Sequence, residues 1–199
     1  MQAGKSSIQF EHPPIITSAA SIVGQTEGEG PLASFFDRVD PDPTFGKKSW
    51  EEAESELQRQ TVQKCLDKAG RQAADVNCLF AGDLLGQIVA TSFGVESFDI
   101  PFFGLYGACS TMGEAMILGA MAAGAGYADR VLALASSHFA SAERQFRFPL
   151  AYGNQRPQST TWTVTGCGCV MIEGNEKNER KDGRRAKENA SESLKNAGQ

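Results

Sequence analysis

The sequence has little histidine, no excess of basic residues and no long apolar run. It holds two histidines in 199 residues and five cysteines. No cysteine spacing matches a zinc ligand set, so we expect no metal site and no cofactor. The most apolar segment, residues 116–127, falls short of the ~20 apolar residues that a membrane span needs. The sequence therefore predicts no transmembrane segment.

The formal net charge of −5 argues against binding to nucleic acid. Residues 1–11 lack an apolar core behind a basic cluster, so they do not form a secretory signal. We therefore expect synthesis in the cytosol, where cysteines stay free thiols. Most of them are expected to be buried. Cys167 and Cys169 share one face of a strand, which favours packing over a redox pair.

Apolar runs, helix caps and glycines predict alternating strands and helices. The expected strands are residues 14–24, 76–81, 100–106, 131–136 and 160–172, and the expected helices are residues 49–70, 86–96 and 108–127. Ser49 is the expected N-cap of the first helix and Gly70 its stop. This alternation predicts an α/β fold with a mostly parallel mixed sheet that helices cover on both faces.

The amino-acid composition of individual segments predicts a central helix, two loops and a charged tail. Residues 108–127 are small, apolar and almost uncharged, which predicts a central helix buried on all sides. Residues 25–48 and 137–159 show no apolar period and are expected to be loops, the first one ordered because its phenylalanines need packing. Residues 174–199 carry few apolar side chains, so we expect a charged, disordered tail behind a domain of residues 1–173.

Cys109 and Asp83 both stand near the end of a predicted strand, where sheets of this kind bind ligands. Cys109 also begins a helix, whose N-terminal field stabilises a thiolate, although a packing role fits the position equally well. Asp83 ends a buried strand and needs partners or a pocket, because an unpaired buried charge is costly. A turn residue that caps the next helix is the alternative for Asp83.

The segment Ser136-Ser137-His138 follows the next strand along the chain. His138 is a candidate hydrogen-bond donor or proton acceptor, and a structural histidine with satisfied ring nitrogens is the alternative.

Arg144 and Arg147 lie three residues apart, so they could share one helical face. Paired arginines suit bidentate recognition of carboxylates. A surface ion pair with Glu143 is the alternative.

The pattern FxxxGACST at residues 103–111 resembles the nucleophile helix of the thiolase superfamily. More narrowly, the chain resembles the stage V sporulation protein AD family over residues 10–173. The similar segments are residues 10–21, 30–37, 47–54, 79–87, 136–157 and 163–168, and the pieces SSH and AERQFR are quite specific to that family.

The resemblance implies a thiolase-like half-fold and a role in spore formation. Members of the family are understood to bind dipicolinic acid, a small aromatic dicarboxylate, and to help move it into the developing spore with other proteins of the same sporulation operon. It implies a cytoplasmic protein of the forespore, peripheral to the spore's inner membrane. It also implies a pocket lined by Asp83, Cys109 and the Ser136-Ser137-His138 segment.

The resemblance covers only the first of the two similar halves that thiolase-like proteins pair. A lone half would expose a sheet edge and apolar helix faces, so we expect a homodimer or a complementing second half. Two alternatives to ligand binding are a thiolase-like acyltransferase with Cys109 as nucleophile and a truncated, non-functional remnant. Acyl transfer needs a base or an oxyanion site opposite the thiol, and His138 is the only histidine near the motifs, so ligand binding is favoured.

Overall fold

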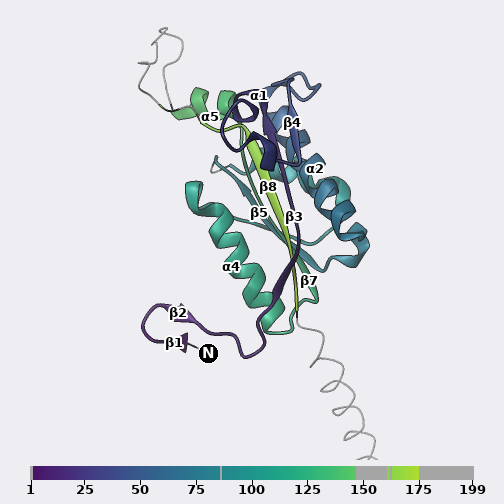
Figure 1. Ribbon diagram of the computed structural model, residues 1–199, viewed down its shortest axis with the longest axis vertical. Helices are drawn as coiled ribbons and strands as arrows, with labels where there is room; N and C mark the ends of the chain where they lie inside the picture. Colours follow the sequence, from purple (N-terminus) through teal and green to yellow (C-terminus); the bar gives the residue numbers. More distant parts are fainter. Residues whose placement is uncertain (1, 86, 147–160, 162, 175–199) are drawn as a thin grey trace, which may run out of the picture.

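The computed structural model describes residues 2–85, 87–146, 161 and 163–174, and a six-stranded mixed sheet forms its centre (Figure 1). The strand order is β4-β3-β8-β7-β5-β6. The strands are β3 (Ile15–Gly24), β4 (Arg38–Asp40), β5 (Cys78–Asp83), β6 (Phe102–Gly104), β7 (Arg130–Ser137) and β8 (Gly166–Glu173). β8 runs antiparallel to both of its neighbours, and the other neighbouring pairs are parallel. A separate hairpin joins β1 (Gln2–Ala3) to β2 (Ser7–Ile8).

Helices lie on both faces of the sheet. They are α1 (Gln25–Gly28), α2 (Trp50–Ala69), α3 (Val89–Val95), α4 (Thr111–Gly124) and α5 (Phe139–Phe146). Figure 1 shows α2 on one side of the strands and α4 on the other, with α1 and α5 together at the top. The larger core cluster joins Leu57 of α2 to Leu79 and Leu132 of the sheet, and a second cluster joins Ala115 of α4 to Val131. The predicted α/β fold with its mostly parallel mixed sheet is confirmed.

Helix α2 begins and ends where the sequence predicts. Ser49 Oγ accepts a hydrogen bond from Glu52 N at 3.2 Å, and the Glu52 carboxylate accepts one from Ser49 N at 3.2 Å. This reciprocal capping box satisfies two backbone donors that the helix itself leaves free. Gly70 ends the helix with a φ of 62°, which glycine adopts without strain. The caps therefore set which side chains of α2 face the sheet.

Two segments that we expected to be loops contain regular structure. Residues 25–48 include α1 and β4, and β4 pairs in parallel with β3. That pairing depends on a distant partner strand and leaves no local period in the sequence. Helix α5 occupies the start of the second segment, with Ala142 fully buried. The expectation that all phenylalanines of the first segment are packed is wrong for Phe35, which is 79% exposed, whereas Phe45 is buried.

Helix α4 is buried on one side, not on all sides as predicted. Its buried face is small, with Ala115 and Gly119 against the sheet. On the outer face Ile117 is 58% exposed and Met121 is 41% exposed. The apolar composition indicates a helix that needs cover on both sides, but the described part of this chain covers only one. The last strand also begins later than predicted, at Gly166.

The predicted tail, residues 174–199, lies outside the described residues except for Gly174. The backbone N–H of Gly174 donates to the Asp129 oxygen at 3.0 Å and so continues the end of β8. In the part of the chain that the structure describes, no helix combines the length and the hydrophobicity that crossing a membrane requires.

Candidate functional site

The carboxyl ends of β5 and β7 meet at one edge of the sheet, where Asp83 and Ser136 are register partners. A cavity of about 210 Å³ opens beside them. Its lining residues come from α2, β5, α3, α5 and the turn after β5, and are Glu51, Glu54, Asp83, Leu85, Gln87, Val89, Ala90, Ser141, Arg144 and Gln145. Asp83 and Arg144 are the sequence-predicted residues among them. This cavity is the candidate site.

Asp83 is 1% exposed and ties the end of β5 to helix α3. Its Oδ2 accepts hydrogen bonds from Thr91 N at 3.1 Å and from Thr91 Oγ1 at 2.8 Å, and its Oδ1 accepts one from Leu85 N at 3.0 Å. Asp83 therefore has the partners that a buried carboxylate needs, and it also lines the cavity.

A chain of hydrogen bonds connects Asp83 to a second buried carboxylate, Glu54 of α2. Gln58 Nε2 donates to Thr91 Oγ1 at 3.0 Å and to Ser136 Oγ at 2.7 Å. Ser136 Oγ in turn donates to Glu54 Oε1 at 2.7 Å. The amide and the two hydroxyls thus direct their protons toward the two carboxylates, so the network holds both side chains in place.

Glu54 is 1% exposed, and burial raises its pKa to about 7, with the nearby charge of Asp83 adding to the effect. Hydrogen bonds from Ser136 and Ser141 work in the opposite direction but are outweighed. Near neutral pH the cavity therefore exchanges a proton at Glu54.

The sequence analysis missed Glu54, Gln58, Thr91 and Ser141 as site residues. The sequence of α2 does indicate two of them. Glu54 and Gln58 are four residues apart and so share one face of the helix, and each directly follows an apolar residue that faces the core. Polar side chains on the buried face of a helix need partners, and here the partners are Ser136 and Thr91.

His138 is fully buried, and both of its ring nitrogens have partners. Nε2 lies 2.7 Å from the Pro43 oxygen and so carries the proton, while Nδ1 accepts from Ala140 N at 3.2 Å. The ring stacks on Trp50 at 5.4 Å, and burial lowers the pKa of His138. This geometry corresponds to the structural alternative, and His138 does not line the cavity.

Of the remaining polar residues predicted for the site, Arg144 and Ser137 do not share a binding partner. Arg144 forms an ion pair with Glu51 of α2, not with Glu143. Ser137 Oγ donates to the Val164 oxygen at 2.6 Å, away from the cavity lining. Arg147 lies outside the described residues. Of the two arginines, the structure therefore places only Arg144 at the cavity.

Cys109 differs from the other cysteines, because it alone of the five free thiols is exposed. It lies in a 3-10 turn (Ala108–Ser110) directly ahead of α4, and Ala108 adopts a left-handed φ of 48°. Helix α4, which follows this turn, lies on the face of the sheet opposite to α2 (Figure 1). No interaction seen among the described residues joins Cys109 to Asp83 or His138. Cys109 is not among the residues that line the cavity.

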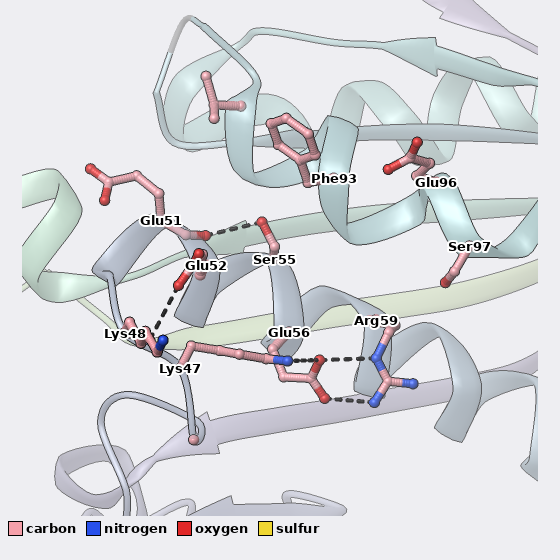
Figure 2. A pocket seen from close by; sticks show the side chains of 12 residues that line it. Lys47, Lys48, Glu51, Glu52, Ser55, Glu56, Arg59, Phe93, Glu96 and Ser97 are labelled. Atoms are coloured by element: carbon pink, nitrogen blue, oxygen red, sulfur yellow. Dashed lines mark hydrogen bonds and ion pairs between the residues drawn. The ribbon is translucent and has the colours of Figure 1, made fainter.

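A larger groove of about 890 Å³ lies between α2 and α3, and two of its cations pair with one carboxylate. Figure 2 shows Lys47 and Arg59 reaching Glu56 from opposite sides, at 3.3 and 2.6 Å. The hydrogen bonds from Arg59, with those from Gln60 and Lys47, hold the pKa of Glu56 at about 2 despite its partial burial. The smaller cavity is the better candidate because it lies at the carboxyl ends of the strands, beside Asp83. In the part of the chain that the structure describes, no group of three or more His, Cys, Asp or Glu side chains is arranged so that it could hold a metal ion.

Solved structures with this architecture define the class of protein. The fold is similar to that of 3-oxoacyl-[acyl-carrier-protein] synthase III from Aquifex aeolicus VF5, with 14% identity and a TM-score of 0.54 over 82% of this chain and 54% of that chain. It is also similar to OleA H285N from Xanthomonas campestris, with 15% identity and a TM-score of 0.56 over 84% of this chain and 57% of that chain. Such identities show the fold alone, which is thiolase-like.

Sequence similarity shows the family. Residues 4–184 match stage V sporulation protein AD, a match that runs past residue 173, where we placed the end of the domain. The chain is 43% identical over 169 residues to stage V sporulation protein AD of Bacillus subtilis (strain 168), which covers 85% of this chain and 50% of that relative. The chain therefore belongs to the stage V sporulation protein AD family, and it spans about half the length of this relative.

Proposed function

We propose that this chain supplies one wall of a binding site for a small aromatic dicarboxylate, dipicolinic acid in a developing spore. The observation that carries the proposal is the cavity at the strand ends, whose lining combines Arg144 with the neutral polar residues Gln87, Ser141 and Gln145. Its volume of about 210 Å³ is below the ~300–1,000 Å³ of pockets for drug-sized ligands, which suits a single ring. Membership of a sporulation family supports this ligand.

The role of Arg144 follows from its geometry. A guanidinium binds a carboxylate through two parallel hydrogen bonds. The side chain of Arg144 is 60% exposed, and its partner Glu51 is 31% exposed. Exposed ion pairs contribute only about 0–1 kcal/mol, so a ligand carboxylate can replace Glu51 at little cost. Arg147 remains a proposed second ligand-binding residue.

In this proposal the chain helps move the ligand into the spore together with other proteins of the same sporulation operon, in the forespore at the inner membrane. Acyl transfer by Cys109 is less well supported. A nucleophilic thiol needs an adjacent base, and among the described residues no base contacts Cys109.

The binding proposal is tested by titrating the purified chain with dipicolinate and following its unfolding temperature. A ligand at one hundred times its Kd adds about 2.7 kcal/mol to the stability of a folded protein, so we expect a clear rise in temperature. Arg144→Gln should weaken binding about tenfold or more, because a hydrogen bond to a charged group contributes about 1.5–3 kcal/mol. Arg59→Gln removes the same charge at the larger groove and should leave the affinity unchanged. An unfolding temperature that does not respond to ligand would refute the proposal.

We also expect the outer face of α4 to be covered, either by a second copy of this chain or by a complementing second half. Ile117 and Met121 lie one helical turn apart on that face, and both are exposed. We expect sedimentation velocity to show self-association of the isolated chain and Ile117→Asp to shift it toward monomer. Phe93→Asp, at an exposed apolar residue of α3, is the matched control and should have no such effect. If the unmodified chain sediments as a monomer at ~100 μM, the homodimer is contradicted, because the expected dimer has a dissociation constant below ~100 μM.

A further inference from the structure

The charges around the cavity set a condition on any anionic ligand. Its lining holds three carboxylates, from Glu51, Glu54 and Asp83, and one cation, Arg144. Helix α3 contributes no charged residue, the turn after β5 contributes only neutral side chains, and β7 contributes the Ser136 hydroxyl. Release of Arg144 from Glu51 would neutralise one ligand carboxylate. The freed Glu51 is 31% exposed, so water screens its charge. The other ligand carboxylate would face the buried Glu54 and Asp83, so loss of charge at one of these two favours the binding of a dianion.

Hydrogen bonds distinguish the two carboxylates. Asp83 accepts two of its bonds from backbone N–H groups, which can only donate. Glu54 accepts only from hydroxyls, those of Ser136 at 2.7 Å and Ser141 at 3.1 Å. A hydroxyl can reverse its role, whereas a backbone N–H cannot.

Ser141 provides the acceptor for a proton on Glu54. Its Oγ lies 3.1 Å from Glu54 Oε2 and 3.1 Å from the His138 backbone oxygen. When Glu54 is protonated, it can donate to Ser141, which then donates to the His138 oxygen. The neutral form of Glu54 is therefore fully hydrogen-bonded inside this site.

We propose that Glu54 takes up the proton that accompanies an anionic ligand into this cavity, so that binding is coupled to protonation. This inference rests on the proposed function and assigns its regulation to a named residue. Glu54 is the positioning and proton-holding residue, and Arg144 is the residue that contacts the ligand carboxylate. Affinity should then fall as pH rises above neutrality, although the ligand and Arg144 keep their charges over that range.

The test is calorimetry of dipicolinate binding to this chain between pH 6.5 and 8.5, in buffers that differ in ionisation enthalpy. We expect proton uptake that rises with pH toward about one proton per ligand, with affinity falling by up to about tenfold per pH unit above pH 7. Glu54→Gln should bind without proton uptake and with an affinity independent of pH. The exposed carboxylate Glu96 provides the control, since Glu96→Gln should keep the pH dependence of the unmodified chain.

The outcomes separate the two proposals. Binding without proton uptake in the unmodified chain overturns the inference and leaves the proposed function standing, even if Glu54→Gln fails to fold. Proton uptake that persists in a folded Glu54→Gln variant also overturns it. Absence of binding at every pH overturns the proposed function and this inference together.

Discussion

Gly82→Ala is expected to destabilise the native structure of this chain severely. A Cβ at Gly82 would lie 2.2 Å from the Leu105 backbone oxygen and 2.8 Å from Thr111 Cγ2. Leu105 cannot withdraw, because its N–H donates to the Ala81 oxygen at 2.8 Å. Overpacking against a fixed backbone destabilises by more than the ~1–3 kcal/mol of ordinary overpacking, and we expect about 4 kcal/mol or more. Urea denaturation followed by circular dichroism measures the loss.

Gly113→Ala is the matched control, because it adds the same methyl group in open space on α4. Alanine is a better helix former than glycine, so this variant should gain about 0.5–1 kcal/mol. A Gly82→Ala variant that unfolds cooperatively within about 1 kcal/mol of the unmodified chain would show that the contact at Leu105 relaxes easily. Gly82 also allows Leu105 and Thr111, which flank the turn that carries Cys109, to approach β5 closely.

The contribution of Glu54 to the stability of the chain is expected to fall as pH rises from about 4.5 to about 7. In the folded chain the pKa of Glu54 is raised from 4.5 to about 7, so the folded state binds more protons than the unfolded state over this interval. Linkage then requires stability to decrease with rising pH, by about 3 kcal/mol in total. Above pH 7 this contribution is lost completely, and below about pH 4.5 it is fully present.

Glu54→Gln removes this proton-binding group, so the variant should gain stability relative to the unmodified chain as pH rises. The comparison between the two chains is needed because His138 acts in the opposite direction: burial lowers its pKa, so it favours the folded state at higher pH. Urea denaturation at pH 5 and pH 8 gives the difference. Parallel pH profiles for the two chains would show that Glu54 is not protonated in the folded state at neutral pH.

Much of the fold follows from local patterns. The apolar runs predicted β3, β5 and β7, and the caps predicted α2, because strand alternation and capping depend on neighbouring residues. The predictions for β4 and for the outer face of α4 were wrong, because both depend on distant parts of the chain and not on neighbouring residues. Strand β4 forms because β3 lies beside it, and the outer face of α4 is exposed because the described part of the chain does not cover it.

The candidate site was predicted in part. Asp83 could be identified from its place at the end of a strand, and Arg144 from the chemistry of carboxylate recognition. Glu54 and Gln58 could not be assigned to the same place, because Gln58 and Ser136 are 78 residues apart in the sequence. Their bond exists only once α2 packs against β7.

By itself, the sequence determined the α/β class, the strand ends that carry the polar residues, and the resemblance to a sporulation family. These depend on periodicity, capping and motifs, which act over a few residues. Only the tertiary structure decided that Glu54 joins Asp83 in a buried network, while Cys109 is exposed and does not line the cavity. The reason is physical: burial and partnership of a polar side chain depend on which distant elements pack around it, and packing is a property of the whole fold.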